Sequence, residues 1–151
     1  MRSAWRFAVL AAFFFWVGGF TFYTAVVVPI GTELLGRDGQ GFITRDVTRR
    51  INLAAAVSLT LLFADLFVTS GTPRARWGLW LFMTACQVAL FWLHAHLDAH
   101  LDPATHSIRE RPSFYQWHRV YLWLHTVQWA AALLTLWLWL RAGGTPAEGG
   151  R

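Results

Sequence analysis

The stretch FAVLAAFFFWVGGFTFYTAVVVPI, residues 7–30, decides the fold of this chain, because its 24 residues include no charged side chain. At about 1.5 Å of rise per residue, a helix of this length covers the roughly 30 Å hydrocarbon thickness of a bilayer. Three further apolar runs follow, at residues 51–68, 77–93 and 120–140. The middle two are slightly short, so we expect their helices to extend into the polar flanks. The sequence therefore predicts an all-α integral membrane four-helix bundle with antiparallel neighbours.

The composition argues in the same direction. Of 151 residues, 56% are hydrophobic and only 14% are charged, whereas an average soluble domain has about 25% charged residues. We expect one transmembrane domain over residues 1–142 and a flexible tail over residues 143–151, which begins Gly-Gly-Thr-Pro. The first apolar run is too long for a signal peptide and has no A-x-A-like cleavage site, so we expect it to be retained.

The basic residues indicate a lipid interface. All 13 are arginines, and they give a net charge of +5. They are scattered over the N-terminus, the loops and the tail, so we expect no nucleic-acid partner. The side that holds both termini and residues 69–76 has the denser short-loop arginines, which favours cytoplasmic termini in a bacterial plasma membrane. Cys86 is the only cysteine and excludes both an intramolecular disulfide and a Cys-pair metal site.

Local signals predict the helix boundaries. The glycine-rich residues 36–41 indicate a turn, after which a second helix begins at residues 42–44. Thr72 and Pro73 resemble an N-cap and first helical position, so a third helix begins there and runs unbroken to about Asp102. Ser113 and Gln116 have the spacing of a capping box for the fourth helix.

Polar side chains recur at helical spacing on three of the predicted helices. Because polar groups are costly in lipid, each polar stripe should face the bundle interior or a hydrated cavity. The start of the second helix, the end of the third and the start of the fourth lie on one membrane side. We therefore predict a polar ligand-binding cluster there, comprising Arg45, Arg49, Asn52, His94, Asp98, His118, Tyr121, His125 and Gln128.

The histidines leave several chemistries open. They can hydrogen-bond between helices as structural groups. A metal ion could use His94, His96, His100 or His125, with His96 and His100 at i, i+4. Haem could be ligated by His125 together with His94, since two imidazoles on adjacent helices can hold one iron. No nucleophile constellation or phosphate-binding loop is recognisable, which argues against an enzyme.

Two short motifs carry a family resemblance: Gly19-Phe20-Thr21-Phe22 leading to Val28-Pro29, and Phe114-Tyr115-Gln116-Trp117-His118. With these motifs the chain resembles an uncharacterised four-helix transmembrane family that includes a membrane protein associated with platinum-drug resistance. Copper-resistance membrane proteins are more distantly similar. The resemblance implies four transmembrane helices and gives no biochemical activity.

Together these observations predict a non-enzymatic membrane protein, or a subunit of a membrane complex. Its polar cluster at one membrane face would bind a small ligand, a metal or a partner. The alternative is a haem-binding electron-transfer subunit. Expected partners are the lipid bilayer and either other membrane subunits or further copies of this chain.

Overall fold

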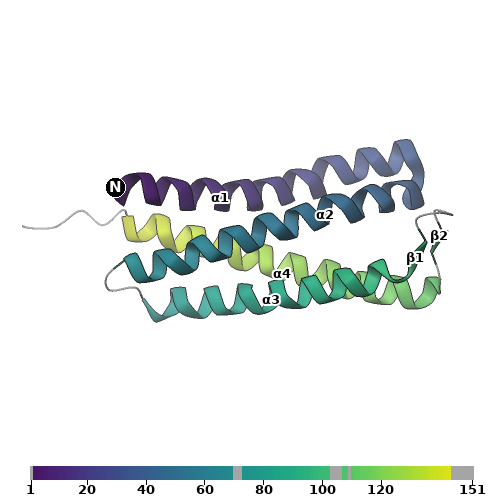
Figure 1. Ribbon diagram of the computed structural model, residues 1–151. Coiled ribbons are helices and arrows are strands. Elements are labelled where there is room, and N and C mark those ends of the chain that lie inside the picture. The colour runs from purple at the N-terminus through teal and green to yellow at the C-terminus, as the bar shows by residue number, and fades with distance from the viewer. Residues whose placement is uncertain (1, 70–72, 103–106, 109, 144–151) are drawn as a thin grey trace, which may run out of the picture.

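The computed structural model describes residues 2–69, 73–102, 107–108 and 110–143. Almost all of them are helical, which confirms the all-α prediction. The helices are α1 (Arg2–Phe22), α2 (Val28–Val68), α3 (Arg74–Asp98) and α4 (Arg111–Gly143). A π-helical turn, η1 (Tyr23–Val27), joins α1 to α2, and two short strands, β1 (Leu101–Asp102) and β2 (Ser107–Ile108), lie between α3 and α4. The four helices run side by side along one long axis (Figure 1).

The chain reverses direction inside α2, at Gly36. This residue has φ 73° and ψ 169°, a backbone conformation that is essentially restricted to glycine. The chain continues from α1 through η1 into the start of α2, turns there and returns along the rest of α2 (Figure 1). The reversal lies within the predicted turn over residues 36–41, but the turn is confined to Gly36, and the predicted helix start at residues 42–44 is wrong. Gly36 alone breaks the helix, and the following residues resume helical geometry.

The π-helical turn has a cause in the sequence. Pro29 has no backbone N–H, and in an α-helix its ring would clash with the carbonyl of Ala25. Widening the preceding turn relieves this clash, and the Val28 N–H accordingly bonds the Tyr23 carbonyl five residues earlier. The wider turn displaces the side chains around Tyr23 relative to a regular helix.

The end of α3 differs from the prediction. α3 ends at Asp98 rather than Asp102, and the His100 N–H bonds Leu97 in a tightened last turn. Asp102 instead pairs with Ser107 in the β1–β2 ladder. The sequence places Pro103 next, and a proline disfavours helical geometry in the residue before it.

The other predicted helix ends differ as well. α4 begins at Arg111, so Ser113 lies inside its first turn and not at a cap. Pro73 is itself the N-cap of α3, and Thr72 lies outside the described residues. Of the predicted tail, Gly143 ends α4, and residues 144–151 lie outside the described residues.

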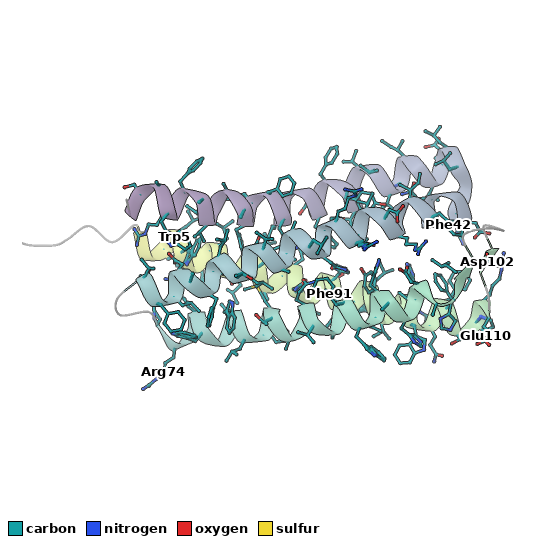
Figure 2. The ribbon with its side chains drawn as sticks, viewed as in Figure 1. Trp5, Phe42, Arg74, Phe91, Asp102 and Glu110 are labelled. Carbon is teal, nitrogen blue, oxygen red and sulfur yellow. The ribbon has the colours of Figure 1, made fainter. Side chains whose placement is uncertain are left out.

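The apolar core occupies the end of the molecule far from Gly36. There Phe13 of α1 packs with Leu59 of α2, Met83 of α3 and Ala132 of α4. A second, smaller cluster near the Gly36 end joins only α3 and α4, through Leu90, Leu93, Leu97 and Tyr121. Trp5 and Arg74 lie at one end of the molecule, and Phe42, Asp102 and Glu110 lie at the other (Figure 2). The site described below lies at the second end.

Replacing Gly36 with alanine should destabilise the fold. A Cβ at this backbone conformation costs about 1–3 kcal/mol. Gly78 is a matched control, because it is helical and exposed and a Cβ added there would meet only open space, so Gly78→Ala should be neutral or stabilising. Denaturant unfolding in detergent, followed by circular dichroism, measures both. Equal stability of Gly36→Ala and wild type would contradict the role given to Gly36.

Candidate functional site

A cavity of about 780 Å³ lies at the Gly36 end, among all four helices and η1. Its volume is within the range of about 300–1,000 Å³ that is usual for small-molecule sites. Most of its wall is apolar or aromatic. The members of the predicted cluster that line this cavity are Arg45, His94, Asp98, His118, Tyr121 and His125.

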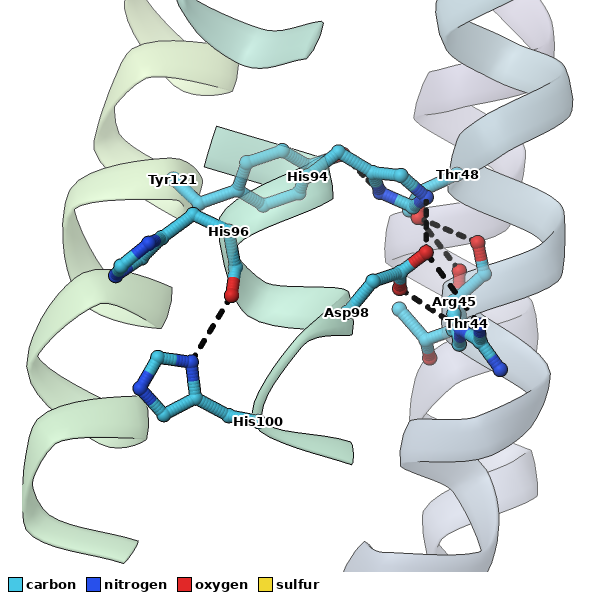
Figure 3. Close-up of polar contacts among 8 residues, drawn as sticks. All are labelled: Thr44, Arg45, Thr48, His94, His96, Asp98, His100 and Tyr121. Carbon is cyan, nitrogen blue, oxygen red and sulfur yellow. Dashed lines mark hydrogen bonds and ion pairs between the residues drawn. The ribbon is translucent and has the colours of Figure 1, made fainter. Parts of the chain in front are cut away.

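An ion pair between α2 and α3 forms one wall. Arg45 Nε donates to Asp98 Oδ1 at 2.8 Å, and Arg45 Nη2 donates to Asp98 Oδ2 at 3.4 Å. His94 Nε2 lies 3.8 Å from Asp98 Oδ2, beyond hydrogen-bonding distance. Figure 3 shows His94 and Asp98 facing α2 from the same side of α3. The predicted approach of Arg45 to Asp98 is thus present in the structure.

The next layer is a buried hydrogen-bond chain across three helices. Asn52 Nδ2 donates to Tyr121 Oη at 3.0 Å, and Gln87 Nε2 donates to Asn52 Oδ1 at 3.4 Å. Gln128 Nε2 donates to Gln87 Oε1 at 3.0 Å. Tyr121 Oη also lies 3.5 Å from His94 Nδ1, which connects the chain to the cavity wall. Asn52 and Gln128 therefore belong to the layer beneath the cavity and do not line it.

His125 is the deepest histidine of the site. Its side chain is 4% exposed, and its Nε2 is buried without a hydrogen-bond partner. The Phe20 ring stacks on its face with the centroids 5.2 Å apart, and the Tyr121 ring meets it edge-on at 4.6 Å. A buried polar atom without a hydrogen-bond partner lowers the free energy of unfolding, so Nε2 in this position weakens the fold.

The remaining predicted site residues lie elsewhere. Arg49 is exposed and is not part of the cavity wall. His96 and His100 project from the opposite side of α3 to His94 (Figure 3). There the His96 ring stacks on Trp92, and His100 Nδ1 lies 2.9 Å from the His96 carbonyl oxygen. The four proposed metal-binding histidines are thus divided between two places. Among the described residues, no three His, Cys, Asp or Glu side chains are grouped closely enough to hold a metal ion.

Sequence reasoning missed a polar cluster at the turn end of the cavity. Tyr23 Oη donates to Thr44 Oγ1 at 2.9 Å, and Gln40 Nε2 donates to Tyr23 Oη at 3.2 Å. Gln40 is 3% exposed, and a Cβ at Gly31 would overlap its side chain. Gln40 lies in the glycine-rich segment that predicts a surface turn. Its pairing with Gly31 depends on the reversal at Gly36 and has no local sequence signal.

Arg45 and His118 line the cavity, lie outside the apolar runs and have shifted pKa values. The hydrogen bond with Asp98 raises the pKa of the Arg45 guanidinium, which therefore stays charged. Burial lowers the pKa of His118 below its ordinary value, so its imidazole is neutral near pH 7. The His118 ring also stacks on Phe114, with the centroids 5.8 Å apart.

The arrangement is suited to binding. It offers aromatic walls, an internally neutralised ion pair and imidazole nitrogens that can donate or accept a hydrogen bond. No family model matches this chain, and no curated protein or solved structure is significantly similar to it. The resemblance described above therefore stays a prediction.

Replacing Asn52 with leucine should destabilise the bundle. The change leaves Tyr121 without one donor and Gln87 without its acceptor, and such a loss costs about 1–3 kcal/mol. Arg49→Gln, one turn earlier on α2, is the control and should change stability by no more than about 0.5 kcal/mol because Arg49 is exposed. Unfolding of both variants in detergent provides the measurement. If Asn52→Leu unfolds like wild type, the chain does not hold the helices together.

Proposed function

We propose that this chain is an integral membrane protein that binds a small ligand in the cavity and is not itself an enzyme. Its apolar side chains lie on the outside and its polar side chains inside, the reverse of the arrangement in a soluble protein. Phe15 is 75% exposed and Phe7 73%, whereas Asn52 and Gln128 are each 1% exposed. Soluble monomers rarely expose large continuous apolar surfaces, and amides buried under such a surface are typical of helices in lipid.

Helix length supports insertion, although by itself only weakly. Within the described residues, two helical segments are long and apolar enough to cross a membrane: Ser3–Val68 and Arg74–Asp98. The first covers 66 residues and reverses at Gly36, so it would supply two antiparallel spans. In this proposal α4 is the fourth span, through its apolar run at residues 120–140, and the protein is a four-helix membrane bundle.

The proposed orientation places both termini in the bacterial cytoplasm. The start of α1, the end of α2, the start of α3 and the end of α4 lie at one end of the molecule (Figure 1). Arg76 at this end pairs with Asp65 at 3.1 Å and lies over the Trp139 ring. The opposite end, with Gly36 and the β strands, would then face the outside.

Single-cysteine labelling tests both insertion and orientation. Cys86 is buried, and Cys86→Ala gives a background on which Arg37→Cys and Arg74→Cys place exposed thiols at opposite ends. A membrane-impermeant maleimide should label Arg37→Cys in intact cells and Arg74→Cys only after permeabilisation. The reverse pattern would overturn the orientation. Equal labelling of both in intact cells would overturn the transmembrane arrangement.

The ligand proposal rests on the unpartnered Nε2 of His125. This residue lines the cavity, yet its buried Nε2 has no partner within the described residues. Burial without a partner weakens a fold, so a histidine kept only for packing would be poorly placed here. A hydrogen bond to a bound ligand would satisfy this nitrogen.

Haem is the second candidate, because His94 lines the same cavity from α3 and its Nε2 also lacks a hydrogen-bond partner. Two such imidazoles on adjacent helices are the donor set of a bis-histidine haem. This candidate predicts a Soret band and about one iron per chain after expression with adequate haem. The resemblance to the four-helix transmembrane family is compatible with either candidate and favours neither.

His125→Leu separates ligand binding from a structural role. Because no protein group bonds Nε2, leucine should preserve or raise the melting temperature. The variant should lose the small molecule or haem that purifies with wild type, as measured by mass spectrometry and absorbance. His100→Leu is the control, since His100 lies outside the cavity, and should retain the bound molecule. If His125→Leu retains it too, the proposed site is wrong.

A further inference from the structure

We propose that the cavity binds an uncharged, flat-ringed lipid of the quinone type, which reaches it sideways from the bilayer between η1 and α4. The inference rests on the proposed function, because it names the ligand class and access route of the same cavity. Three features carry it: the position of the side opening, the pairing of the charges and the shape of the aromatic wall.

The side opening lies within the apolar runs. Several cavity-lining residues are exposed on the outer surface, and those nearest the middle of the molecule come from the first helical segment and from α4: Thr21, Thr24, Ala25, Leu122 and Thr126. All five belong to the runs at residues 7–30 and 120–140, which cross the bilayer in the proposed arrangement. A molecule dissolved in the lipid would therefore meet this opening directly.

The threonine hydroxyl groups at the opening have no proton free to donate to a ligand. Thr21 Oγ1 donates to the Val17 carbonyl at 2.7 Å and accepts from Trp129 Nε1 at 2.9 Å, which links α1 to α4 at the edge of the opening. Thr24 Oγ1 donates to the Phe20 carbonyl at 2.9 Å. Thr126 Oγ1 donates to the Leu122 carbonyl at 3.0 Å. Because each hydroxyl proton is used within its own helix, the opening is suited to a hydrocarbon tail.

The charged residues that line the cavity carry no net formal charge, which disfavours an anionic head group; they are Arg37, Asp38, Arg45 and Asp98. Arg45 makes two bonds to Asp98, so the pair has no net charge. At this ion pair a carboxylate or phosphate would have to displace Asp98 from Arg45 or lie beside the Asp98 carboxylate, where like charges repel each other. An uncharged head group leaves the ion pair intact.

The inner wall favours a flat ring with hydrogen-bonding oxygens. The Phe20 and His125 rings are stacked within 15° of parallel, and those of Phe114 and His118 within 16°. Parallel pairs of this kind give flat surfaces against which a planar ring can pack. The buried Nε2 atoms of His94 and His125 make no hydrogen bond within the described residues, and in this proposal the ring carbonyls of the ligand would supply the partner.

Binding of three probes to the purified full chain in nanodiscs tests the ligand class. Decylubiquinone has an uncharged ring, dodecanol an uncharged head without a ring, and dodecanoate a charged head. Dissociation constants from native mass spectrometry should be at least about tenfold lower for decylubiquinone than for either other probe, which corresponds to about 1.4 kcal/mol. Equal or tighter binding of dodecanoate or dodecanol would overturn the proposed class.

Two neighbouring substitutions test the access route. Thr126→Trp narrows the opening, whereas Val127→Trp adds the same ring to an exposed position outside the cavity wall. Thr126→Trp should weaken decylubiquinone binding about tenfold or more, and Val127→Trp should leave it within about twofold. Thr24→Trp with Val26→Trp as control repeats the comparison from the other side of the opening, should Thr126→Trp not fold. Unchanged binding in both opening variants would overturn the sideways route.

Failure of this inference is distinguishable from failure of the proposed function. If none of the probes binds but a different small molecule purifies with wild type and is lost in His125→Leu, the quinone class is wrong and the ligand site stands. If nothing purifies with wild type and none of the probes binds, both are wrong.

Discussion

The hydrogen-bond chain from Gln128 through Gln87 and Asn52 to Tyr121 is the interaction on which the site depends. Each of these side chains is at least 95% buried, so each needs a partner from another helix. The chain fixes the rotation of α2, α3 and α4 about their own axes, because turning any one of them would leave amides unsatisfied in apolar surroundings. The same rotation brings Arg45, Asp98 and His94 to the cavity wall and leaves Val57 of α2 and Val88 of α3 exposed.

The cavity itself arises from irregularities in the first helical segment. Pro29 forces the π-helical turn at Tyr23–Val27, and Gly36 then reverses the chain. Gln40 fits against Gly31 inside this reversal and bonds Tyr23. These contacts hold η1 and the first part of α2 against the part of α2 that follows Gly36. The small core cluster near this end joins only α3 and α4. The space between the two pairs of helices is therefore left to the cavity.

The surroundings of His125 favour ligand binding at the expense of stability. A polar nitrogen in a stacked aromatic setting, with no protein partner for Nε2, is a local conflict that contrasts with the hydrogen-bonded amides beneath the cavity. Such conflicts are found preferentially at functional sites, where the missing partner arrives with the ligand. The ion pair of Arg45 and Asp98 shows the opposite arrangement, because it is satisfied within the protein and favours uncharged occupants.

The sequence by itself determined the all-α class and the separation of apolar runs from polar stripes, since helical periodicity and run length are local properties. It also indicated that Arg45, Asn52, Asp98 and Tyr121 share one end of the molecule, because alternate helix ends meet there. It did not determine the exact helix ends. Within the predicted glycine-rich turn Gly36 alone breaks the helix, and Gln40 resumes helical geometry and packs against Gly31. α3 ends before Asp102, which pairs with Ser107 in the strand ladder. Helical spacing already placed His96 and His100 on the side of α3 away from His94 and Asp98. Only the tertiary structure decided that Arg49 lies outside the cavity, that Gln40 is buried against Gly31 and that His125 Nε2 has no partner. A rotation of one helix by a few tens of degrees changes each of these, and no local pattern records that angle.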